Sequence, residues 1–319
     1  MSTRTELLKL LSENTGIYLS GQKIGESLGV SRNAVWKAMQ HLREEGYQIE
    51  SRKGKGYCLA NDCDILSQEA ISSYLHDPSF QIIVKSEVTS TNDVLKELAQ
   101  QGYPEKCVLI AQTQTKGKGR KGRSFYSPND DGLYMSLLLR PKQLKPEDTL
   151  LLSALSACAV QSGIKRVTGL DTQIKWVNDI YLKGKKVCGI LCEGSCSIET
   201  NEFDYIIVGI GINCHNTTFP QDIKGIAASL QSASFIRAKL AAAIIADFFK
   251  DYQTLPNRDF LSHYRKHSCV IGKMIQVYQG NQTYPAKVLD IDEHGYLIIE
   301  KDGHLETLSS GEITIRVKS

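Results

Sequence analysis

The middle of this 319-residue chain contains the basic, glycine-rich stretch Gln114-Thr-Lys-Gly-Lys-Gly-Arg-Lys-Gly-Arg123. Its glycines let backbone N–H groups turn toward one anion, and its guanidinium groups supply planar, paired donors. The stretch is not a P-loop, because the chain contains no Gly-Lys-Ser or Gly-Lys-Thr sequence. Composition alone leaves two interpretations open: a cradle for a phosphate group, or a solvated basic loop or nucleic-acid patch.

The segments on both sides of this loop alternate between helical and strand-like patterns, from about Ile65 onward. Such alternation predicts a mixed α/β domain. A nearly apolar helix over 147–163 is expected to be buried, and 172–176 and 181–193 are expected to form a hairpin around 183–185. The other expected elements are helices over 65–76, 90–101 and 235–255, and strands over 82–85, 108–112, 132–140 and 205–213.

The first sixty residues follow the order of a winged helix-turn-helix domain. Apolar residues at helical spacing predict helices over 3–11 and 22–28, and Gly29 suits the tight turn that follows. Ser31 is a good N-cap for a third helix, which Gly46 ends. The wing would consist of strands over 47–51 and 56–60, joined by the basic tip Arg52-Lys-Gly-Lys-Gly56.

The formal net charge of +3 lies entirely within residues 1–60, because the rest of the chain is neutral overall. A recognition helix presents the side chains near its N-terminus to the major groove, and a basic wing contacts phosphates. We therefore expect this domain to bind DNA, although winged helices also serve as protein-binding modules. The expected DNA-binding residues are Ser31, Arg32, Asn33, Trp36, Lys37, Arg52, Lys53 and Lys55.

The last fifty residues show strand-like runs separated by hairpin turns, which predicts a small SH3-like β-barrel. The expected strands cover 274–278, 284–290, 296–300 and 313–317. The histidines near this region, His263, His267 and His294, lack the spacing of metal ligands and are expected to be structural.

The N-terminus has no continuous apolar segment typical of a signal peptide, so we expect a cytoplasmic protein that does not contact membranes. The nine cysteines lie mostly in apolar surroundings, as reduced thiols do. Cys188, Cys192 and Cys196 have three-residue gaps, unlike zinc knuckles, and are expected to share one face of a strand. No metal ligands are predicted.

Five motifs together resemble those of the biotin–protein ligases, in that family's order and spacing. With a winged helix ahead and a small β domain behind, the chain resembles the bifunctional form that is both ligase and biotin-operon repressor. The motifs are Ser90-Thr-Asn92, Gln114-Thr115 with Gly117-Lys-Gly-Arg-Lys-Gly-Arg123 and Ser127-Pro128, Lys175-Trp-Val-Asn-Asp179, Lys186-Val-Cys-Gly-Ile-Leu-Cys-Glu193, and Gly209-Ile-Gly-Ile-Asn213.

The resemblance implies an α+β multidomain protein with three parts. These are a winged helix-turn-helix DNA-binding domain over 1–62, a central mixed α/β ligase domain of the biotin/lipoate ligase type over 65–267, and an SH3-like β-barrel over 268–319. It also implies an ATP- and Mg²⁺-dependent reaction that joins biotin to AMP and passes biotin from biotinyl-5′-AMP to a carrier lysine. The adenylate would serve as corepressor for a homodimer at operator DNA, and the carrier would be a biotin carboxyl carrier protein domain.

The resemblance also assigns roles to individual residues. Fixed cations relieve the repulsion between the biotin carboxylate and the α-phosphate, so cationic side chains are expected at their junction. The implied catalytic residues are Lys186, Arg120 and Asp179, with Asp179 steering or deprotonating the acceptor lysine. The implied biotin-binding residues are Ser90, Thr91, Asn92, Gln114, Lys118, Gly119, Arg120 and Lys186. The implied ATP-binding residues are Arg123, Asn178, Asn213, Glu312 and Arg316.

Three positions depart from the family's commonest pattern. Lys118 stands where many members have arginine, and Val177 replaces a frequent proline. Phe219 is the single aromatic residue in the loop 216–230, which leaves open whether the adenine is stacked there.

Several alternatives also remain open. Lys186 could be a solvated hairpin lysine, Asp179 a turn cap and Trp176 a core residue. A ligand-sensing repressor without catalysis and a lipoate-type ligase are the competing functions.

Overall fold

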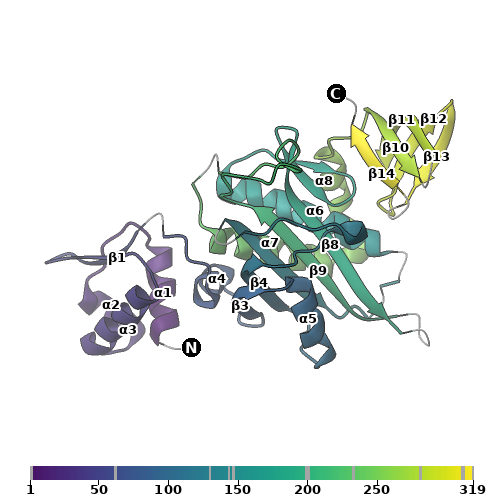
Figure 1. Cartoon of the computed structure of the whole chain (residues 1–319). Helices are drawn as coiled ribbons and strands as arrows, with labels where there is room; N and C mark the ends of the chain where they lie inside the picture. Colours follow the sequence, from purple (N-terminus) through teal and green to yellow (C-terminus); the bar gives the residue numbers. More distant parts are fainter. Residues whose placement is uncertain are drawn as a thin grey trace.

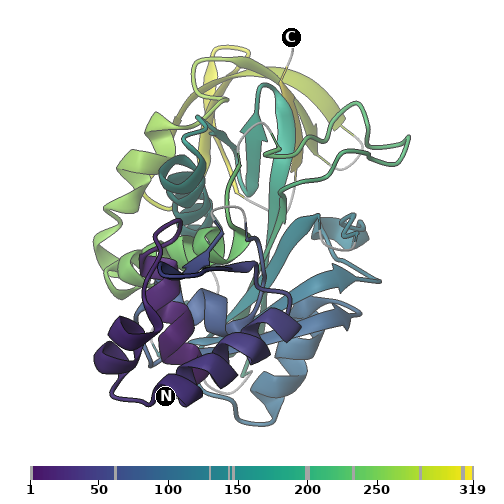
Figure 2. The ribbon, with the colours of Figure 1, turned by 90° about the vertical axis from the view of Figure 1, so that its left-hand side faces the viewer.

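The computed structural model describes residues 3–60, 63–128, 131–142, 144–145, 148–197, 202–231, 234–279, 282–309 and 313–317. A small helical domain, a large central sheet with helices and a small β domain follow one another from the N-terminal to the C-terminal end of an elongated molecule (Figure 1). This arrangement confirms the expected α+β architecture. Figure 2 views the molecule from the end that carries the helical domain.

The N-terminal domain is a winged helix. Its recognition helix begins after Ser31, whose hydroxyl accepts a hydrogen bond from the Ala34 N–H at 3.2 Å. Gly29 has a φ of 64°, the left-handed conformation that the turn between the second and third helices requires. The elements are α1 (Thr3–Glu13), α2 (Gly21–Leu28), α3 (Arg32–Glu44), β1 (Ile49–Arg52) and β2 (Gly56–Leu59).

The winged helix packs against helix α4 (Gln68–Leu75), and one apolar core runs through both. Tyr47 places its hydroxyl 2.6 Å from that of Ser67, the N-cap of α4. Arg4 forms ion pairs with Glu45 of the winged helix and with Glu69 of α4. The two domains are therefore joined by packing and polar contacts in addition to the linker.

The segment that enters the central domain is held by a buried cluster of charges. The Asp64 carboxylate accepts hydrogen bonds from the Arg237 backbone N–H at 2.7 Å and from the Arg237 Nε–H at 2.6 Å. The Arg237 side chain is only 6% exposed, and His215 Nε2 lies 3.3 Å from the same carboxylate. Burial would raise the pKa of Asp64, but the hydrogen bond from His215 and the charge of Arg237 outweigh it and hold that pKa below its ordinary value.

The central domain contains a seven-stranded sheet in the order β3-β4-β5-β9-β8-β7-β6. Only β3 and β4 are parallel among the described pairings. The strands are β3 (Gln81–Val88), β4 (Cys107–Gln114), β5 (Gly132–Leu139), β6 (Gln173–Lys175), β7 (Asp179–Leu182), β8 (Lys185–Cys196) and β9 (Phe203–Asn213).

Helices cover both faces of this sheet, so its central strands are apolar on both sides. In β4, Leu109 packs on the side of helix α5 (Thr91–Gln100), whereas Val108 and Ile110 belong to the larger core on the other side. The helices that complete that side are α6 (Thr149–Thr168), α7 (Arg237–Gln253) and α8 (Phe260–Lys266). Among the described residues no helix is long and apolar enough to cross a membrane.

Two expectations about this domain were wrong. Helix α6 continues through Gly163 to Thr168 instead of ending at this glycine. Glycine stands there because α7 packs closely against it: a Cβ at this position would lie 2.7 Å from Ile244 Cγ1. The expected hairpin over 172–193 is three strands, since Trp176-Val177-Asn178 forms a corner between β6 and β7. Trp176 was expected to end the first strand, but it is buried outside the sheet.

The C-terminal domain is a curved antiparallel sheet in the order β13-β12-β11-β10-β14 (Figure 1). The expected small β domain is confirmed, with one more strand than the sequence predicts. The added strand, β13, lies at the sheet edge and carries exposed polar residues that hide its pattern. The strands are β10 (Met274–Gln279), β11 (Gln282–Ile291), β12 (Leu297–Lys301), β13 (His304–Leu308) and β14 (Ile313–Val317).

Candidate functional site

A cavity of about 710 Å³ lies between the glycine-rich loop, the N-terminus of α5 and strands β8 and β9. The motifs quoted from the sequence, far apart along the chain, meet at its walls. Every site residue that the resemblance implies within 65–267 lines this cavity: Ser90, Thr91, Asn92, Gln114, Lys118, Gly119, Arg120, Arg123, Asn178, Asp179, Lys186 and Asn213.

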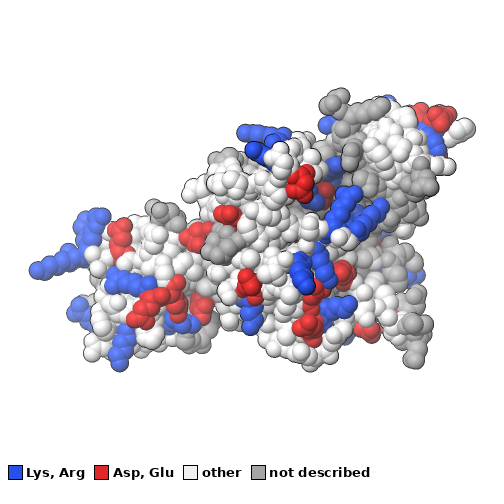
Figure 3. Space-filling model, in the orientation of Figure 1, with Lys and Arg blue, Asp and Glu red and all other residues white. Residues whose placement is uncertain are grey.

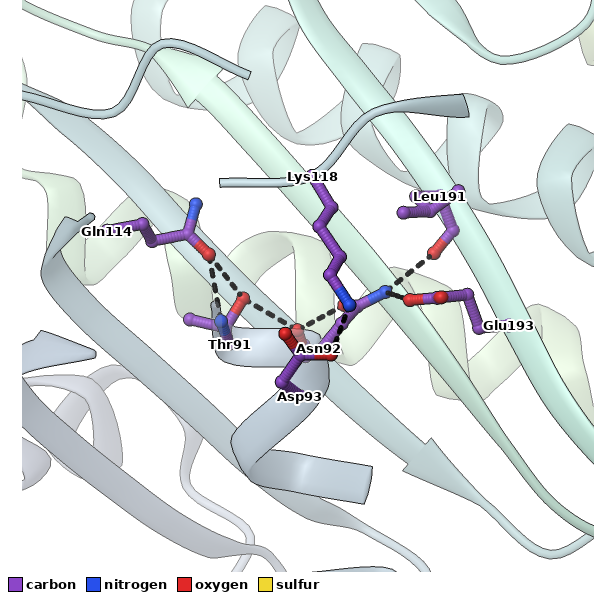
Figure 4. Close-up of polar contacts among 8 residues, drawn as sticks. Thr91, Asn92, Asp93, Gln114, Lys118, Leu191 and Glu193 are labelled. Atoms are coloured by element: carbon purple, nitrogen blue, oxygen red, sulfur yellow. Dashed lines mark hydrogen bonds and ion pairs between the residues drawn. The ribbon is translucent and has the colours of Figure 1, made fainter. Parts of the chain in front are cut away.

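One end of the cavity is lined by uncharged polar groups. Gln114 Oε1 accepts hydrogen bonds from the Thr91 N–H at 2.8 Å and from the Thr91 hydroxyl at 3.2 Å (Figure 4). Ser90 precedes α5, but its side chain makes no capping hydrogen bond, unlike the N-caps Ser31 and Ser67. Ser90 lines the cavity, and its hydroxyl is not used as a helix cap.

Asn92 ties this end of the cavity to the sheet rather than pointing freely into the cavity. Its amide donates to Glu193 Oε2 at 2.6 Å and to the Leu191 carbonyl at 3.4 Å (Figure 4). Its oxygen accepts a hydrogen bond from the fully buried Ser136 hydroxyl at 2.7 Å. Gly209 makes room for it, because a Cβ at that position would lie 2.2 Å from Asn92 Oδ1.

Glycines also form the floor of the cavity, and an aromatic ring lies on them. A Cβ at Gly211 would lie 2.6 Å from the ring of Phe125, and one at Gly189 would lie 3.2 Å from that ring. These glycines explain why the motifs on β8 and β9 need residues without side chains: the space above the sheet belongs to the cavity and its aromatic wall.

The other end of the cavity is cationic. Lys186 Nζ pairs with Asp179 Oδ1 at 2.6 Å, and Arg120 Nη1 donates to Asn178 Oδ1 at 3.3 Å. Lys118 is more exposed and pairs with Asp93 (Figure 4). These cations are thus held by neutral or acidic neighbours at the cavity wall.

The loop 216–230 lies along the cavity and contributes Phe219. Its backbone is held by Lys186, whose N–H donates to the Ile226 carbonyl and whose carbonyl accepts from the Ala228 N–H. The Phe219 ring lies 6.2 Å from that of Tyr126, and both line the cavity. Two aromatic side chains therefore border this part of the cavity, where the sequence alone offered one.

Two of the implied ATP-binding residues are not placed at the cavity. Glu312 lies outside the described residues. Arg316 belongs to β14, where its backbone pairs with that of Gln276 in β10. The side chain of Arg316 is not described.

The sequence did not indicate two side chains that order the cavity. These are Ser136 and Glu193, which both form hydrogen bonds with Asn92. A lone serine within the apolar strand Gly132–Leu139 was the available signal for the first.

The expected DNA-binding residues are all exposed, at the start of α3 and on the wing. Arg32, Asn33 and Lys37 are exposed on α3, and Trp36 beside them is 52% exposed despite its size. Lysine and arginine side chains project from the hairpin tip at this end of the molecule (Figure 3). Arg52 is positioned by Tyr18, which lies 4.9 Å below its guanidinium group, and by Glu50 at 3.7 Å.

The cysteines behave as small apolar residues. All nine are free, and Cys188, Cys192 and Cys196 lie on β8 as expected. Burial raises the pKa of Cys192 to about 11, so this thiol stays protonated at neutral pH. Within the described part of the chain, no group of three or more His, Cys, Asp and Glu side chains is arranged to hold a metal ion.

Comparisons with known proteins agree with this geometry. Residues 84–213 match the Biotin/lipoate A/B protein ligase family, residues 3–58 match an HTH domain, and residues 270–316 match the Biotin protein ligase C terminal domain. The bifunctional ligase/repressor BirA of Bacillus spizizenii is 35% identical, over 98% of this chain and 98% of its own. Its namesake from Escherichia coli is 29% identical, over 99% of each chain.

The fold is likewise similar to a solved structure. The biotin protein ligase from Aquifex aeolicus, solved in complex with biotin and ATP, superposes with a TM-score of 0.65 at 27% identity. The match covers 75% of this chain and 99% of that chain.

Proposed function

This chain belongs to the family of the bifunctional ligase/repressor BirA, and we propose on that premise how its cavity and its winged helix work. It is a biotin–protein ligase that also carries a repressor's DNA-binding domain. The observation that supports the site assignment most strongly is that one cavity joins a neutral polar end to a cationic end.

The first reaction activates biotin. A carboxylate oxygen of biotin attacks the α-phosphorus of ATP, the bond to the β-phosphate breaks, and pyrophosphate leaves with its electron pair. Ser90, Thr91 and Gln114 would hold the ureido ring at the neutral end. The valerate chain would then run over the glycine floor toward the cations.

The cationic end lowers the barrier to this step. Two anions must meet there, and fixed positive charges that need no reorganisation stabilise the transition state most effectively. Lys186 and Arg120 would lie at the junction of carboxylate and phosphate, with Arg123 on the outer phosphates. Phe219 and Tyr126 would border the adenine.

Magnesium would enter with the nucleotide rather than occupy a site of its own. Mg²⁺ commonly binds through one or two carboxylates together with substrate phosphates. The cavity offers oxygen donors of this kind from Asn178, Asn213, Asp179 and Asp222. When bound, the ion would neutralise phosphate charge.

The second reaction transfers biotin to a carrier. The ε-amine of the carrier lysine attacks the acyl carbon of the adenylate, the bond to the AMP oxygen breaks, and AMP leaves. Asp179 lines the cavity within reach of Lys186 and would accept the proton that the attacking amine must lose. The acceptor would be a lysine of a biotin carboxyl carrier protein domain.

The winged helix would make this enzyme a repressor. One recognition helix reads only a short half-site, whereas two copies related by a twofold axis read a palindrome. We therefore assign operator binding to a homodimer that forms when the adenylate is bound. Nine free cysteines suit a reducing compartment, and we place both activities in the cytoplasm.

Pyrophosphate release tests the assignment against its alternatives. The protein is incubated with ATP and either biotin or lipoate. Release with ATP and biotin, but not with ATP and lipoate, supports the proposal. Release with lipoate would indicate a lipoate ligase, and binding of biotin without any release would indicate a sensor that has lost catalysis.

A further inference from the structure

We propose that the C-terminal part of the chain positions the catalytic end of the cavity by holding the corner Trp176-Val177-Asn178 from behind, with Trp176 and Tyr264 as positioning residues. This inference rests on the proposed adenylation reaction and deepens it, because it gives the segment after α7 a role at a site that this segment does not line.

The front of the corner faces the cavity and sets the cations. The Asn178 amide donates to the Ile190 carbonyl at 2.6 Å, and the Ile190 N–H donates back to the Asn178 carbonyl at 3.0 Å. The Asn178 side-chain oxygen accepts from Arg120, and the next residue, Asp179, pairs with Lys186. Both catalytic cations are thus held by residues whose positions depend on this corner.

The back of the corner is held first through Trp176, which is only 5% exposed. Its indole N–H donates to the Gly295 carbonyl at 2.8 Å, across 119 residues of sequence. Gly295 lies between β11 and β12 with a φ of 78°, and a Cβ at this position would lie 3.7 Å from Leu150 Cγ and Leu151 Cδ2 at the start of α6. The C-terminal sheet therefore presents a fixed acceptor to the corner.

Tyr264 of α8 makes a second contact behind the corner. Its side chain is fully buried, and its hydroxyl donates to the Val177 carbonyl at 2.8 Å. The strand before the corner is held in the same way, because the Ile174 N–H donates to the His267 carbonyl and the Ile174 carbonyl accepts from the Cys269 N–H. Consecutive residues of the corner are thus anchored from α8 and from the chain that follows it.

The segment after α7 acts at a distance from the reacting atoms. Within the described residues, no side chain beyond Ala227 lines the cavity. Loss of a contact behind the corner leaves a buried carbonyl unpaired, and the chain relieves this by moving the corner. A misplacement of about 1 Å at reacting groups costs roughly 100-fold in rate, so small movements here are measurable.

Two substitutions remove one hydrogen bond each. Tyr264→Phe keeps the ring and deletes only the hydroxyl, whereas Trp176→Phe deletes the indole N–H together with part of a ring that lines the cavity, so Tyr264→Phe is the cleaner test. Tyr252→Phe is the matched control: it removes a hydroxyl that donates to Glu105 Oε1 at 3.3 Å from α7, outside the cavity wall. Thermal midpoints of all three variants report the purely structural cost.

Calorimetry with biotin alone counts the competent sites and measures their affinity, and pyrophosphate release is then expressed per competent site. We expect Tyr264→Phe and Trp176→Phe still to bind one biotin per protein, because the neutral end stands on α5 and β4, with a weaker affinity because the biotin carboxylate would meet the displaced Lys186 and Arg120. We expect turnover per site to fall about tenfold or more, with a higher KM for ATP. Tyr252→Phe should match the wild type.

Turnover per site equal to that of Tyr252→Phe in both variants would overturn the proposal. A fall in biotin stoichiometry that accounts for the whole loss of activity would also overturn it, because that is the signature of partial unfolding. If Trp176→Phe does not fold, Tyr264→Phe decides alone. A wild-type protein that released no pyrophosphate would instead refute the proposed function.

Discussion

At the scale of single residues, the pairing of Lys186 with Asp179 connects sequence and chemistry most directly. The ammonium group lies at the cationic end of the cavity and is preorganised by a carboxylate that does not leave with the substrate. Neighbouring Lys183 and Lys185 are exposed and do not line the cavity, which separates Lys186 from the solvated hairpin lysines beside it.

Replacement of Lys186 by alanine is therefore expected to leave a folded protein that adenylates biotin poorly. Loss of one preorganised donor at a developing anion costs about 100- to 1,000-fold in turnover. Pyrophosphate release measures the effect, and Lys185→Ala serves as the control because it removes an exposed lysine of the same strand. Adenylation near the wild-type rate in Lys186→Ala would remove this residue from the catalytic set.

Asp64 makes a prediction about stability and pH. Its folded pKa lies below the ordinary value, so its contribution to stability is present above the unfolded pKa, about 3.9, and is lost as the pH falls through the folded pKa. Asp64→Asn should lower the free energy of unfolding by about 1.5–3 kcal/mol at neutral pH, because Arg237 loses its charged partner.

Urea unfolding of the wild type and of Asp64→Asn at several pH values checks this. The difference between the two proteins should stay constant above about pH 5 and shrink as the pH falls below about 4. A difference that grows under acid would show that Asp64 is not held ionised by Arg237 and His215.

At the scale of elements, the wing makes the clearest prediction. Lys53 and Lys55 are exposed at the hairpin tip, and each phosphate contact releases counterions when DNA binds. Lys53→Ala and Lys55→Ala should each flatten the dependence of operator affinity on salt by about one unit. Titrations at several salt concentrations measure the slope, with exposed Lys250→Ala on α7 as the control. Unchanged slopes in both wing variants would mean that the wing does not touch DNA.

The elements also show what sequence can and cannot predict. The winged helix and the mixed sheet follow from periodicity and caps, which are local, whereas the polar and cationic site residues follow from the resemblance of the motifs to those of the biotin–protein ligases. The sequence predicted that α6 ends at Gly163. This glycine instead makes room for Ile244 of α7, which is far along the chain. The partners of Asn92 and Trp176 could not be predicted, since Ser136, Glu193 and Gly295 reach them only through tertiary packing.

At the scale of the whole molecule, we propose that the adenylate couples ligase activity to DNA binding. The glycine-rich loop exposes Lys121 and Arg123 at the cavity, and an adenylate would neutralise charge there. The winged helix is packed on the ligase domain through α4 and through Asp64, so the two domains are physically joined. A ligand in the cavity can therefore change the DNA affinity only if it binds one conformation of the two packed domains more tightly than another.

We expect biotin with ATP to promote homodimerisation, and operator DNA and adenylate each to strengthen binding of the other by the same factor. Sedimentation with and without the two substrates, followed by operator titration under both conditions, measures this. Equal dimerisation and equal operator affinity in the two conditions would refute the switch and leave the ligase assignment untouched.

The central claim is that the cavity activates biotin and passes it to a protein lysine. Transfer of labelled biotin to a purified biotin carboxyl carrier protein domain, in the presence of ATP and Mg²⁺, tests this most directly. We expect labelling of the carrier to require ATP. The label should be lost when the acceptor lysine of the carrier is replaced, and it should fall sharply in Lys186→Ala. Pyrophosphate release without labelled carrier, or no release at all, would contradict it.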